Sequence, residues 1–416
     1  MKILFVNYTC IGDNNATGQT LQSLFDGMQG IEIMQLCLSP SPKKDPLFQT
    51  INCSWRDSLL NYFIGKYHSG VTGKSNSAKT TSLSSSRKFK LVFQAKQLIL
   101  KIQDLLGISL SRKINAEIKK FMPDLVYTLG GSVCVCKLCC RLSKELSIPV
   151  VMHSMDDHIH TKYQSGSFLD KTLKKLFVNE TREIYKISKI GMAIGPKMAE
   201  EYEKEFQIPF SWAMNCIDST HYQPIKLYQP IRLIFSGGVH GGRDVTLVQL
   251  IDYISNYNKN RDVKVYLEVY TNPQGVSLLK EYENEYAKIC NYVSKAELFS
   301  NLSRATLLLH VESFEPDFQK YFRLSMSTKI PEYLSVGRPI LFIGPEDIGT
   351  GEYLRKTSVA FSISSIEKCG QVFDSLNPDI IQTMCEQALV LFQRNHTRKE
   401  AQEKLRNVFI SAINAK

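Results

Sequence analysis

Short apolar runs alternate with longer segments of helical periodicity along the first half of the chain. Apolar runs of this length are typical of strands buried on both faces of a parallel sheet. Such runs occur at residues 2–6, 32–36, 123–128, 148–153 and 191–194. The segments between them, among them 19–28 and 196–206, are predicted to be helices. This alternation predicts a doubly wound α/β domain over residues 1–215.

The same alternation begins again after Pro224 and Pro230. Strands are predicted at 231–236, 263–270, 305–311 and 339–343, helices at 245–257, 278–286 and 328–336, and a last helical segment at about 378–415. A chain of 416 residues exceeds one comfortable core, in agreement with two domains. We therefore expect a second Rossmann-like domain over 216–380 and closing helices over 381–416, with the two sheets facing a cleft.

Residues 69–90 differ from both halves because they are rich in Ser, Thr and Lys and contain few apolar residues. Such a composition cannot bury enough apolar surface to fold alone, and it predicts a mobile loop. The helix predicted next, at 89–106, carries a narrow polar stripe that includes Lys101 and Asp104. We expect its broad apolar face to pack on the domain core, and contact with lipid is the alternative.

Positive charge is concentrated in residues 66–120. This stretch holds twelve lysines and arginines against two acids, a balance of +10, while the whole chain carries +11. A local basic segment favours an anionic surface as partner, either lipid or nucleic acid, and a solvated exposed loop is the third interpretation. No motif that reads nucleic acid accompanies the charge, so we expect lipid and no nucleic acid.

No apolar run approaches the ~18 residues that a membrane span requires. The apolar N-terminus ends after Val6, which is too short for a secretory signal. We therefore expect a cytoplasmic protein, attached peripherally to the inner face of the cell membrane through residues 66–120. Eleven cysteines in such a protein predict reduced thiols rather than a disulfide framework.

Four cysteines, Cys134, Cys136, Cys139 and Cys140, form a tight cluster that could suggest a metal site. A second cysteine pair at zinc-ribbon spacing is absent from the sequence. Because free cysteine behaves as a small apolar residue, the favoured interpretation is a helix that buries these thiols in a core.

The strongest local signal for chemistry is the segment GGVHGG at 237–242, which follows a predicted strand and precedes a helix. Glycines such as Gly237 and Gly238 let a backbone approach a ligand closely, and the helix N-terminus behind them favours phosphate. Arg243 at the helix start offers a planar fork that suits a diphosphate. The alternative is a tight turn with a solvated arginine.

A second signal is the segment Ser327, Thr328, Lys329, followed by Glu332 and, later, Gly337. Ser327 is a good N-cap and Gly337 a natural terminator, so a short helix is predicted to start here. Lys329 and Glu332 are three residues apart and share one helical face. A cation for phosphate and a carboxylate for ribose hydroxyls are what a nucleoside diphosphate requires. An internal Lys–Glu pair on a surface helix is the alternative.

These motifs carry a resemblance to a known family. The strand followed by GGVHGGRD, then HVESF at 310–314, then STKIPEYLSVGRPILFIGP at 327–345 resembles the donor-binding half of retaining, family-4-type GT-B glycosyltransferases of the kind that build bacterial capsule and O-antigen polysaccharides. The segment from Ala193 to Asp218 resembles the interdomain region of that family. The resemblance spans most of the chain, but only the C-terminal half carries specific motifs.

The resemblance implies roles for several residues in the second domain. Arg243 and Lys329 would bind the donor diphosphate, Glu332 the ribose, and Glu312 would lie near the donor sugar. The chain departs from the usual pattern of two glutamates eight residues apart, because Leu324 stands eight before Glu332. It also has Gly238 where an arginine is common.

In the first domain, the dipeptide after the predicted strand 148–153 is Met155–Asp156 instead of the common His–Asp. Asp156 and Asp157 are therefore the candidates on the acceptor side. They do not form Asp-x-Asp, so neither a metal nor another cofactor is implied. Either carboxylate, or a donor phosphate oxygen, would accept the proton of the acceptor.

The function that these observations favour is transfer of a sugar, with retention, from a nucleotide sugar to a lipid-linked or saccharide acceptor in the synthesis of a cell-surface polysaccharide. One alternative is a GT-B nucleotide-sugar epimerase, which needs no acceptor. The other is a non-enzymatic basic protein that binds a membrane or nucleic acid.

Overall fold

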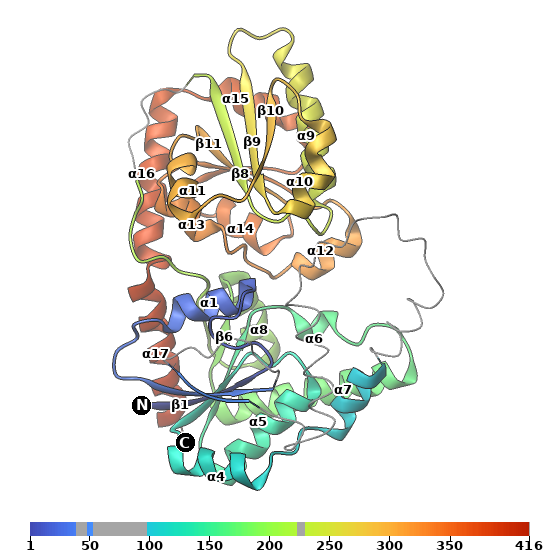
Figure 1. Cartoon of the computed structure of the whole chain (residues 1–416), viewed down its shortest axis with the longest axis vertical. Coiled ribbons are helices and arrows are strands. Elements are labelled where there is room, and N and C mark those ends of the chain that lie inside the picture. The colour runs from blue at the N-terminus through green and yellow to red at the C-terminus, as the bar shows by residue number, and fades with distance from the viewer. Residues whose placement is uncertain (39–47, 53–97, 223–228, 416) are drawn as a thin grey trace. The chain divides into compact units, whose positions relative to one another are not determined.

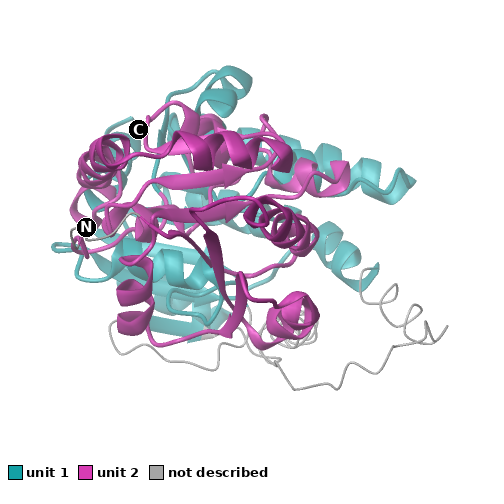
Figure 2. Cartoon of the chain, turned by 90° about the horizontal axis from the view of Figure 1, so that it is seen from above, with its two compact units in different colours: residues 1–194, 198–213, 402–416 teal, residues 195–197, 214–401 magenta. Residues whose placement is uncertain are grey.

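The structure is a computed structural model that describes residues 1–38, 48–52, 98–222 and 229–415. The loop expected at 69–90, and the part of the basic segment before residue 98, lie outside the described residues. The chain divides into two compact units (Figure 2). Unit 1 comprises Met1–Ile194, Met198–Ala213 and Gln402–Lys416, and unit 2 comprises Gly195–Lys197 and Met214–Ala401.

Unit 1 is built on a seven-stranded sheet of order β3-β2-β1-β4-β5-β6-β7, in which every neighbouring pair is parallel. Because β1 lies in the middle and the chain extends first to one edge and then to the other, the sheet is doubly wound. The strands are β1 (Lys2–Asn7), β2 (Glu32–Cys37), β3 (Gln49–Asn52), β4 (Leu125–Thr128), β5 (Val150–Ser154), β6 (Gly191–Ala193) and β7 (Phe210–Trp212).

Helices flank this sheet (Figure 1). Those of unit 1 include α1 (Ala16–Phe25), the helical residues 98–106, α4 (Arg112–Phe121), α5 (Val133–Leu146), α6 (His158–Thr161) and α7 (Phe168–Ser188), with most of α8 (Pro196–Phe206) and most of α17 (Arg398–Asn414). Their starts follow from local capping chemistry: the side chain of Asn15 accepts from the amide of Gly18, and Ser167 caps α7 in the same way. From α17, Phe409 packs on Phe25 and on Tyr127, which closes the core of the unit.

Unit 2 is built on a six-stranded, fully parallel sheet of order β10-β9-β8-β11-β12-β13. The strands are β8 (Ile231–Ser236), β9 (Val265–Thr271), β10 (Ala287–Asn291), β11 (Leu307–Val311), β12 (Ile340–Ile343) and β13 (Ala360–Ile363). The helices are α9 (Arg243–Asn258), α10 (Pro273–Leu279), α11 (Lys295–Leu302), α12 (Pro316–Phe322), α13 (Ile330–Ser335), α14 (Gly349–Arg355), α15 (Cys369–Ser375) and α16 (Pro378–Asn395). Both sheets thus have the parallel, doubly wound layout that the sequence predicts.

The helix predicted at 278–286 is wrong. In its place α10 ends at Leu279, a single 3-10 turn follows, and β10 begins at Ala287. The side chain of Asn284 accepts from the amides of Tyr286 and Ala287 and so forms a turn where a helix was expected. The sheet then takes the following residues as an edge strand.

The last helical segment is interrupted rather than continuous. It forms α16 and α17, which are separated at His396 and Thr397. His396 is buried, and its Nε2 lies 2.7 Å from the hydroxyl of Tyr353. Thr397 forms a bridge with Ile217, so this break lets the backbone pair with the segment that enters unit 2. Residues up to Ala401 belong to unit 2, and those from Gln402 return to unit 1.

The described part of the helix predicted at 89–106 has the opposite orientation to the expected one. Residues 98–106 are helical, but their apolar residues face outward, with Ile102 40% and Leu106 68% exposed. Asp104 is buried, because it accepts from the hydroxyl of Tyr163 at 2.7 Å and from the amide of Cys134 at 3.2 Å. The polar stripe therefore faces the protein, and packing of the apolar face on the core is wrong for these residues.

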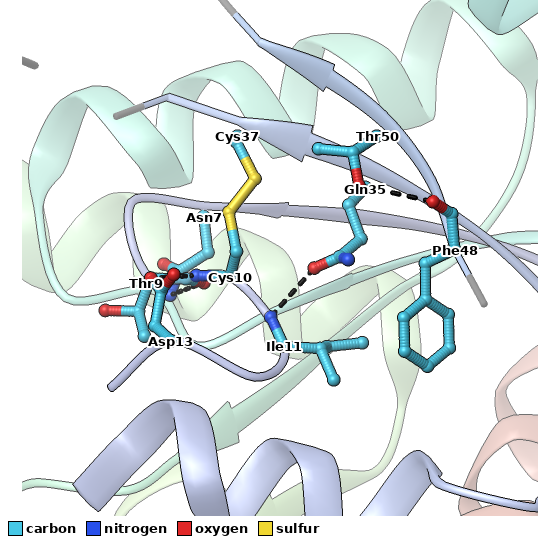
Figure 3. Close-up of a disulfide and its surroundings, with 9 residues drawn as sticks. All are labelled: Asn7, Thr9, Cys10, Ile11, Asp13, Gln35, Cys37, Phe48 and Thr50. Carbon is cyan, nitrogen blue, oxygen red and sulfur yellow. Dashed lines mark hydrogen bonds between the residues drawn. A yellow bond between two sulfur atoms is a disulfide. The ribbon is translucent and has the colours of Figure 1, made fainter. Parts of the chain in front are cut away.

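Within the described residues, the cysteines form one disulfide and a set of free thiols. Cys10, in the loop after β1, is joined to Cys37 at the end of β2, with 6.2 Å between their Cα atoms (Figure 3). The same loop is held by Asp13, which accepts from the amide of Cys10, and by Gln35, which accepts from the amide of Ile11. The expectation of reduced thiols alone is therefore wrong for this pair. Neighbouring parallel strands end at the same edge and bring together two residues 27 apart in sequence.

The cluster on α5 is buried, as expected. Cys134, Cys136, Cys139 and Cys140 are free thiols, and no group of three or more potential metal ligands occurs among the described residues. Desolvation by burial raises the pKa of Cys134 to about 12, so this thiol stays protonated at neutral pH.

Candidate functional site

Four of the residues singled out in the second half of the sequence, Gly237, Gly238, Arg243 and Glu312, follow the carboxyl ends of β8 and β11. These two strands are neighbours in the middle of the unit 2 sheet, with Phe235 opposite Leu309. Arg243 begins α9 after the loop that follows β8, and Glu312 follows β11 directly. Ligands of open parallel sheets bind at this edge, beyond the carboxyl ends of the strands.

Arg243 and Glu312 form a two-pronged ion pair. Nε of Arg243 donates to Oε2 of Glu312 at 3.0 Å, and Nη2 donates to Oε1 at 2.9 Å. The arginine side chain is 15% exposed and the glutamate 3%, so the pair lies mostly out of water. Bidentate geometry of this kind is the strong form of a charge-assisted hydrogen bond.

A histidine completes the environment of this carboxylate. Nε2 of His310 lies 3.0 Å from Oε1 of Glu312, and because an ionised carboxylate only accepts, the imidazole is the donor. Burial alone would raise the pKa of Glu312. The hydrogen bond from His310 and the charge of Arg243 outweigh burial and hold this pKa below its usual value. Glu312 is therefore ionised at neutral pH.

The glycine-rich loop takes its shape partly from packing against the segment after β11. Gly241 and Gly242 have φ of +74° and +78°, where a side chain would be strained. A Cβ at Gly242 would lie 2.2 Å from Oγ of Ser313, and one at Gly241 would lie 3.0 Å from the ring of Phe322. This second pair of glycines is thus required by the protein itself.

Of the first two glycines in the loop, only Gly237 has room beside it for a Cβ. A Cβ on Gly237 would make only ordinary contacts, the nearest at 3.5 Å, whereas one on Gly238 would meet the ring of His240 at 2.8 Å. The amide of Gly237 already donates to the carbonyl of Tyr270. Gly237 is therefore the glycine of this loop that packing within the protein requires least, although its amide is already used.

The second cluster lies where α13 begins. Lys329 is the N-cap residue, and its amide donates to Oγ of Ser327 at 3.3 Å. The cap thus lies two residues later than predicted, and the helix has six residues, ending before Gly337 with φ +61° as expected. Nζ of Lys329 lies 3.1 Å from Oε2 of Glu332, and both side chains are partly exposed. The two side chains share one face as predicted, and the ion pair between them is the one that the sequence left open as the alternative.

Tyr333 attaches this helix to the edge where Arg243 lies. Its hydroxyl accepts from the amide of Ser236, at the end of β8, and donates to the carbonyl of Leu309 in β11. The carbonyl of Thr328 accepts from Nδ2 of Asn215 at 3.1 Å, which secures the approach to the helix. The glycine loop and the Arg243–Glu312 pair therefore lie at the ends of β8 and β11, and the helix that carries Lys329 and Glu332 is attached to the same ends through Tyr333.

The sequence did not predict the structural roles of four residues of this site, namely His310, Ser313, Phe322 and Tyr333. One signal could have indicated His310, because residues two apart on a strand face the same side. Phe322 had no such signal, since its contact with Arg243 depends on where α12 lies.

In unit 1, Asp156 and Asp157 follow the carboxyl end of β5 but differ in environment. Asp157 is buried, and its Oδ1 accepts from the hydroxyl of Tyr202 at 2.9 Å and lies 2.7 Å from Nδ1 of His160. Burial would raise the pKa of Asp157, but the hydrogen bond and charge of His160 lower it overall. Asp156 is exposed, and desolvation by the surrounding protein raises its pKa despite the opposing charge of Lys162.

Comparison with known sequences gives a partial match. No family model matches the chain. Glucosyltransferase 3 of Streptococcus gordonii is 29% identical over 121 residues, a match that spans 28% of this chain and 36% of that protein. The chain thus covers about a third of the length of this relative.

Solved structures match nearly the whole chain. A glycosyltransferase of Rickettsia africae is similar over 100% of this chain and 99% of its own, with 12% identity and a TM-score of 0.60. HepE of Anabaena, solved in complex with UDP, is similar over 99% and 100%, with 11% identity and a TM-score of 0.62. Sucrose-phosphate synthase of Thermosynechococcus elongatus covers 100% of both chains, with 11% identity and a TM-score of 0.60. The fold is GT-B.

This result confirms the predicted fold class, two Rossmann-like domains with parallel sheets. Each helix among the described residues is too short or too polar to cross a bilayer.

Proposed function

We propose that this chain is a glycosyltransferase that takes a sugar from a nucleotide-sugar donor bound at the carboxyl edge of the unit 2 sheet. The observation that carries the proposal is that Arg243 begins α9 beyond the end of β8, while α13, whose N-cap is Lys329, is attached through Tyr333 to the ends of β8 and β11. Two further observations support it: the GT-B fold, and the UDP and UDP-glucose complexes of HepE, which shares that fold.

In the proposed donor complex, Arg243 and Lys329 bind the diphosphate. A guanidinium has five N–H donors, and the bonds to Glu312 use one on Nε and one on Nη2, so both on Nη1 remain for phosphate. The N-terminus of α9, a helix of 16 residues whose N-cap Gly242 offers no side chain, adds a favourable dipole. Glu332 is proposed to accept from ribose hydroxyls, with Gly238, Ser327 and Thr328 lining the diphosphate.

The chemical step proposed is transfer with retained configuration, without a metal. As the bond from the sugar to the β-phosphate breaks, negative charge grows on that phosphate, and Arg243 and Lys329 stabilise it. Of the two acceptor-side carboxylates, we favour Asp156 as the proton acceptor, because it is exposed and its pKa is raised above its usual value. Asp157 is proposed to hold the loop in place, and the close pairing of Glu312 with Arg243 favours a binding rather than a chemical role for that residue.

The acceptor proposed is lipid-linked or a saccharide, in the synthesis of a cell-surface polysaccharide, as the sequence resemblance implies. Attachment to the inner face of the membrane is supported by the exposed cations Arg112, Lys113, Lys119 and Lys120 on α4 and by the outward apolar residues of 98–106. Flotation with liposomes of anionic and of zwitterionic lipid tests this part. We expect binding to anionic vesicles, weakened by 0.5 M salt, and no binding to either would remove the membrane from the proposal.

The donor site is tested by thermal shift with UDP-, GDP-, CMP- and dTDP-sugars. A bound donor raises the melting temperature of the wild type by mass action, and Lys329→Ala is expected to lose most of that shift. The matched control is Lys259→Ala, because Lys259 lies at the far end of the helix that Arg243 begins. If no nucleotide sugar stabilises the wild type, the proposed donor site is wrong. Conversion of a UDP-sugar in the absence of any acceptor would instead indicate an epimerase.

A further inference from the structure

The diphosphate-binding arginine of this chain does not stand alone but is held from two directions. We infer that His310 and Phe322 are positioning residues of the donor site. His310 holds the carboxylate of Glu312 that pairs with Arg243, and the ring of Phe322 lies against the guanidinium of Arg243. Together they hold this guanidinium in place for a diphosphate. This inference rests on the proposed function, because it names what prepares the same site for its ligand.

The plane of Arg243 is set by an aromatic ring. The centre of the guanidinium lies 4.7 Å from the ring centroid of Phe322, at the end of α12. Stacking of this kind is attractive, and it limits rotation of the guanidinium about its last bonds. The same ring lies against Gly241, so one side chain contacts both the glycine loop and the arginine that follows it.

One edge of the guanidinium of Arg243 is held by a chain of hydrogen bonds that starts in β11. His310 is buried and stacks on Phe342, which leaves its Nε2 directed to Oε1 of Glu312. The carboxylate of Glu312 then accepts hydrogen bonds from Nε and Nη2, along one edge of the guanidinium of Arg243. A long, flexible side chain thus has its edge and its plane both determined before a ligand arrives, so less rotamer entropy is lost on binding.

The element that supplies Phe322 belongs to the stretch that separates Glu312 from Glu332 by twenty residues. Within it, Ser313 and Phe318 pack against Gly242, and the carbonyl of Glu312 accepts from the hydroxyl of Thr246 on α9. The start of α9 and the segment after β11 are therefore locked together around Arg243. The extra residues have a physical purpose in this interpretation, because they supply the ring that holds the arginine.

The experiment compares nucleoside diphosphate with monophosphate binding. The wild type is titrated calorimetrically with UDP, GDP, CDP, ADP and dTDP. The diphosphate that binds most tightly and the corresponding monophosphate are then titrated separately into each variant. Phe322→Leu keeps the apolar bulk but removes the aromatic face, and we expect about threefold to tenfold weaker diphosphate binding with monophosphate binding almost unchanged. Tyr321→Leu is the matched control, since Tyr321 is the exposed aromatic neighbour on the same helix, and it should bind like the wild type.

His310 is tested by rescue. His310→Leu removes the donor to Glu312 and should weaken diphosphate binding about tenfold, whereas His310→Gln retains an N–H donor and should recover most of the loss. Circular dichroism and melting temperature establish that each variant is folded. If the buried His310 variants do not fold, the partly exposed Phe322 still decides the question.

Three results would overturn the inference. Equal losses for the diphosphate and the monophosphate in Phe322→Leu would indicate general damage to the site. Tighter diphosphate binding in Phe322→Leu or His310→Leu would mean that Glu312 competes with the ligand for Arg243. Wild-type affinity in both variants would mean that the contacts are merely structural. A wild type that binds none of the five nucleotides would remove the proposed function as well, so the two failures are distinguishable.

Discussion

The carboxyl edges of the two sheets hold charged side chains in contrasting states. At the edge of unit 2, Arg243 and Lys329 are each paired with a glutamate but keep N–H donors to spare. At the edge of unit 1, one carboxylate, Asp157, is buried and hydrogen-bonded, while its neighbour Asp156 is exposed. One edge therefore presents paired cations, and the other presents an exposed carboxylate with a raised pKa.

This contrast shows what a partner does to a charged group. A salt bridge that leaves donors uncommitted orients a cation without using it up. A carboxylate that already accepts from Tyr202 and His160 is stabilised in its ionised form and becomes a poor base. The following predictions are designed to break or sharpen this difference, beginning with the largest expected effect.

Arg243→Ala should have the largest effect. Loss of the cation that faces the leaving phosphate is expected to lower the transfer rate about 10²-fold to 10³-fold. The buried Glu312 also loses its counter-charge, which should destabilise unit 2 by about 3–5 kcal/mol. Product formation and urea unfolding measure the two effects. Arg243→Met combined with Glu312→Leu should recover stability but not activity; recovery of both would show that Arg243 does not bind the donor.

Asp156→Asn should lower kcat about 10²-fold with little change in stability, because an exposed base is lost but no buried bond is broken. The rate of the wild type should also fall on the acidic side at a higher pH than an ordinary aspartate would produce, since its pKa is raised above 3.8. A pH profile of kcat/KM measures this. An unchanged rate in Asp156→Asn would favour a donor phosphate oxygen as the proton acceptor.

Asp157→Asn should affect stability, by about 1–3 kcal/mol, through the weakened bonds to Tyr202 and His160. The folded-state pKa of Asp157 is held below 3.8, so its stabilisation is complete above about pH 4 and is lost as pH falls through that pKa. Asp156 has the opposite sign: its raised pKa contributes stability at low pH that is lost as pH rises through it. Unfolding of wild type and variant at several pH values measures the difference. If the difference in unfolding free energy between wild type and Asp157→Asn grew as the pH fell, the lowered pKa of Asp157 would be contradicted.

Glu332→Gln should have the smallest effect, about threefold weaker nucleotide binding, from one weakened hydrogen bond to ribose. Binding of a 2′,3′-dideoxynucleotide should not change, because that ligand lacks the hydroxyls concerned. Calorimetry with both ligands makes the test. A loss that is the same for both would place Glu332 as the partner of Lys329 rather than of the ribose.

The site was predicted best where its features are local. Gly337 after the end of α13, the shared face of Lys329 and Glu332, and the start of α9 near Arg243 depend on residues within a few positions of each other, and all are found as expected. The pairing of Glu312 with Arg243 was not predicted. It was expected near the donor sugar, but its partner Arg243 lies 69 residues away in sequence, and such a distance leaves no periodic signal.

Sequence by itself determined the two parallel sheets, because alternation of buried runs and amphipathic segments is a local property that only this layout satisfies. Tertiary structure alone decided which side of residues 98–106 faces the protein, that Cys10 meets Cys37, and that residues 287–291 join the sheet. Each depends on an element distant in the chain, namely Tyr163 for Asp104, β2 for Cys10 and β9 for β10. Long-range contacts select among conformations that local preference leaves nearly equal in free energy, and only the assembled fold makes those contacts.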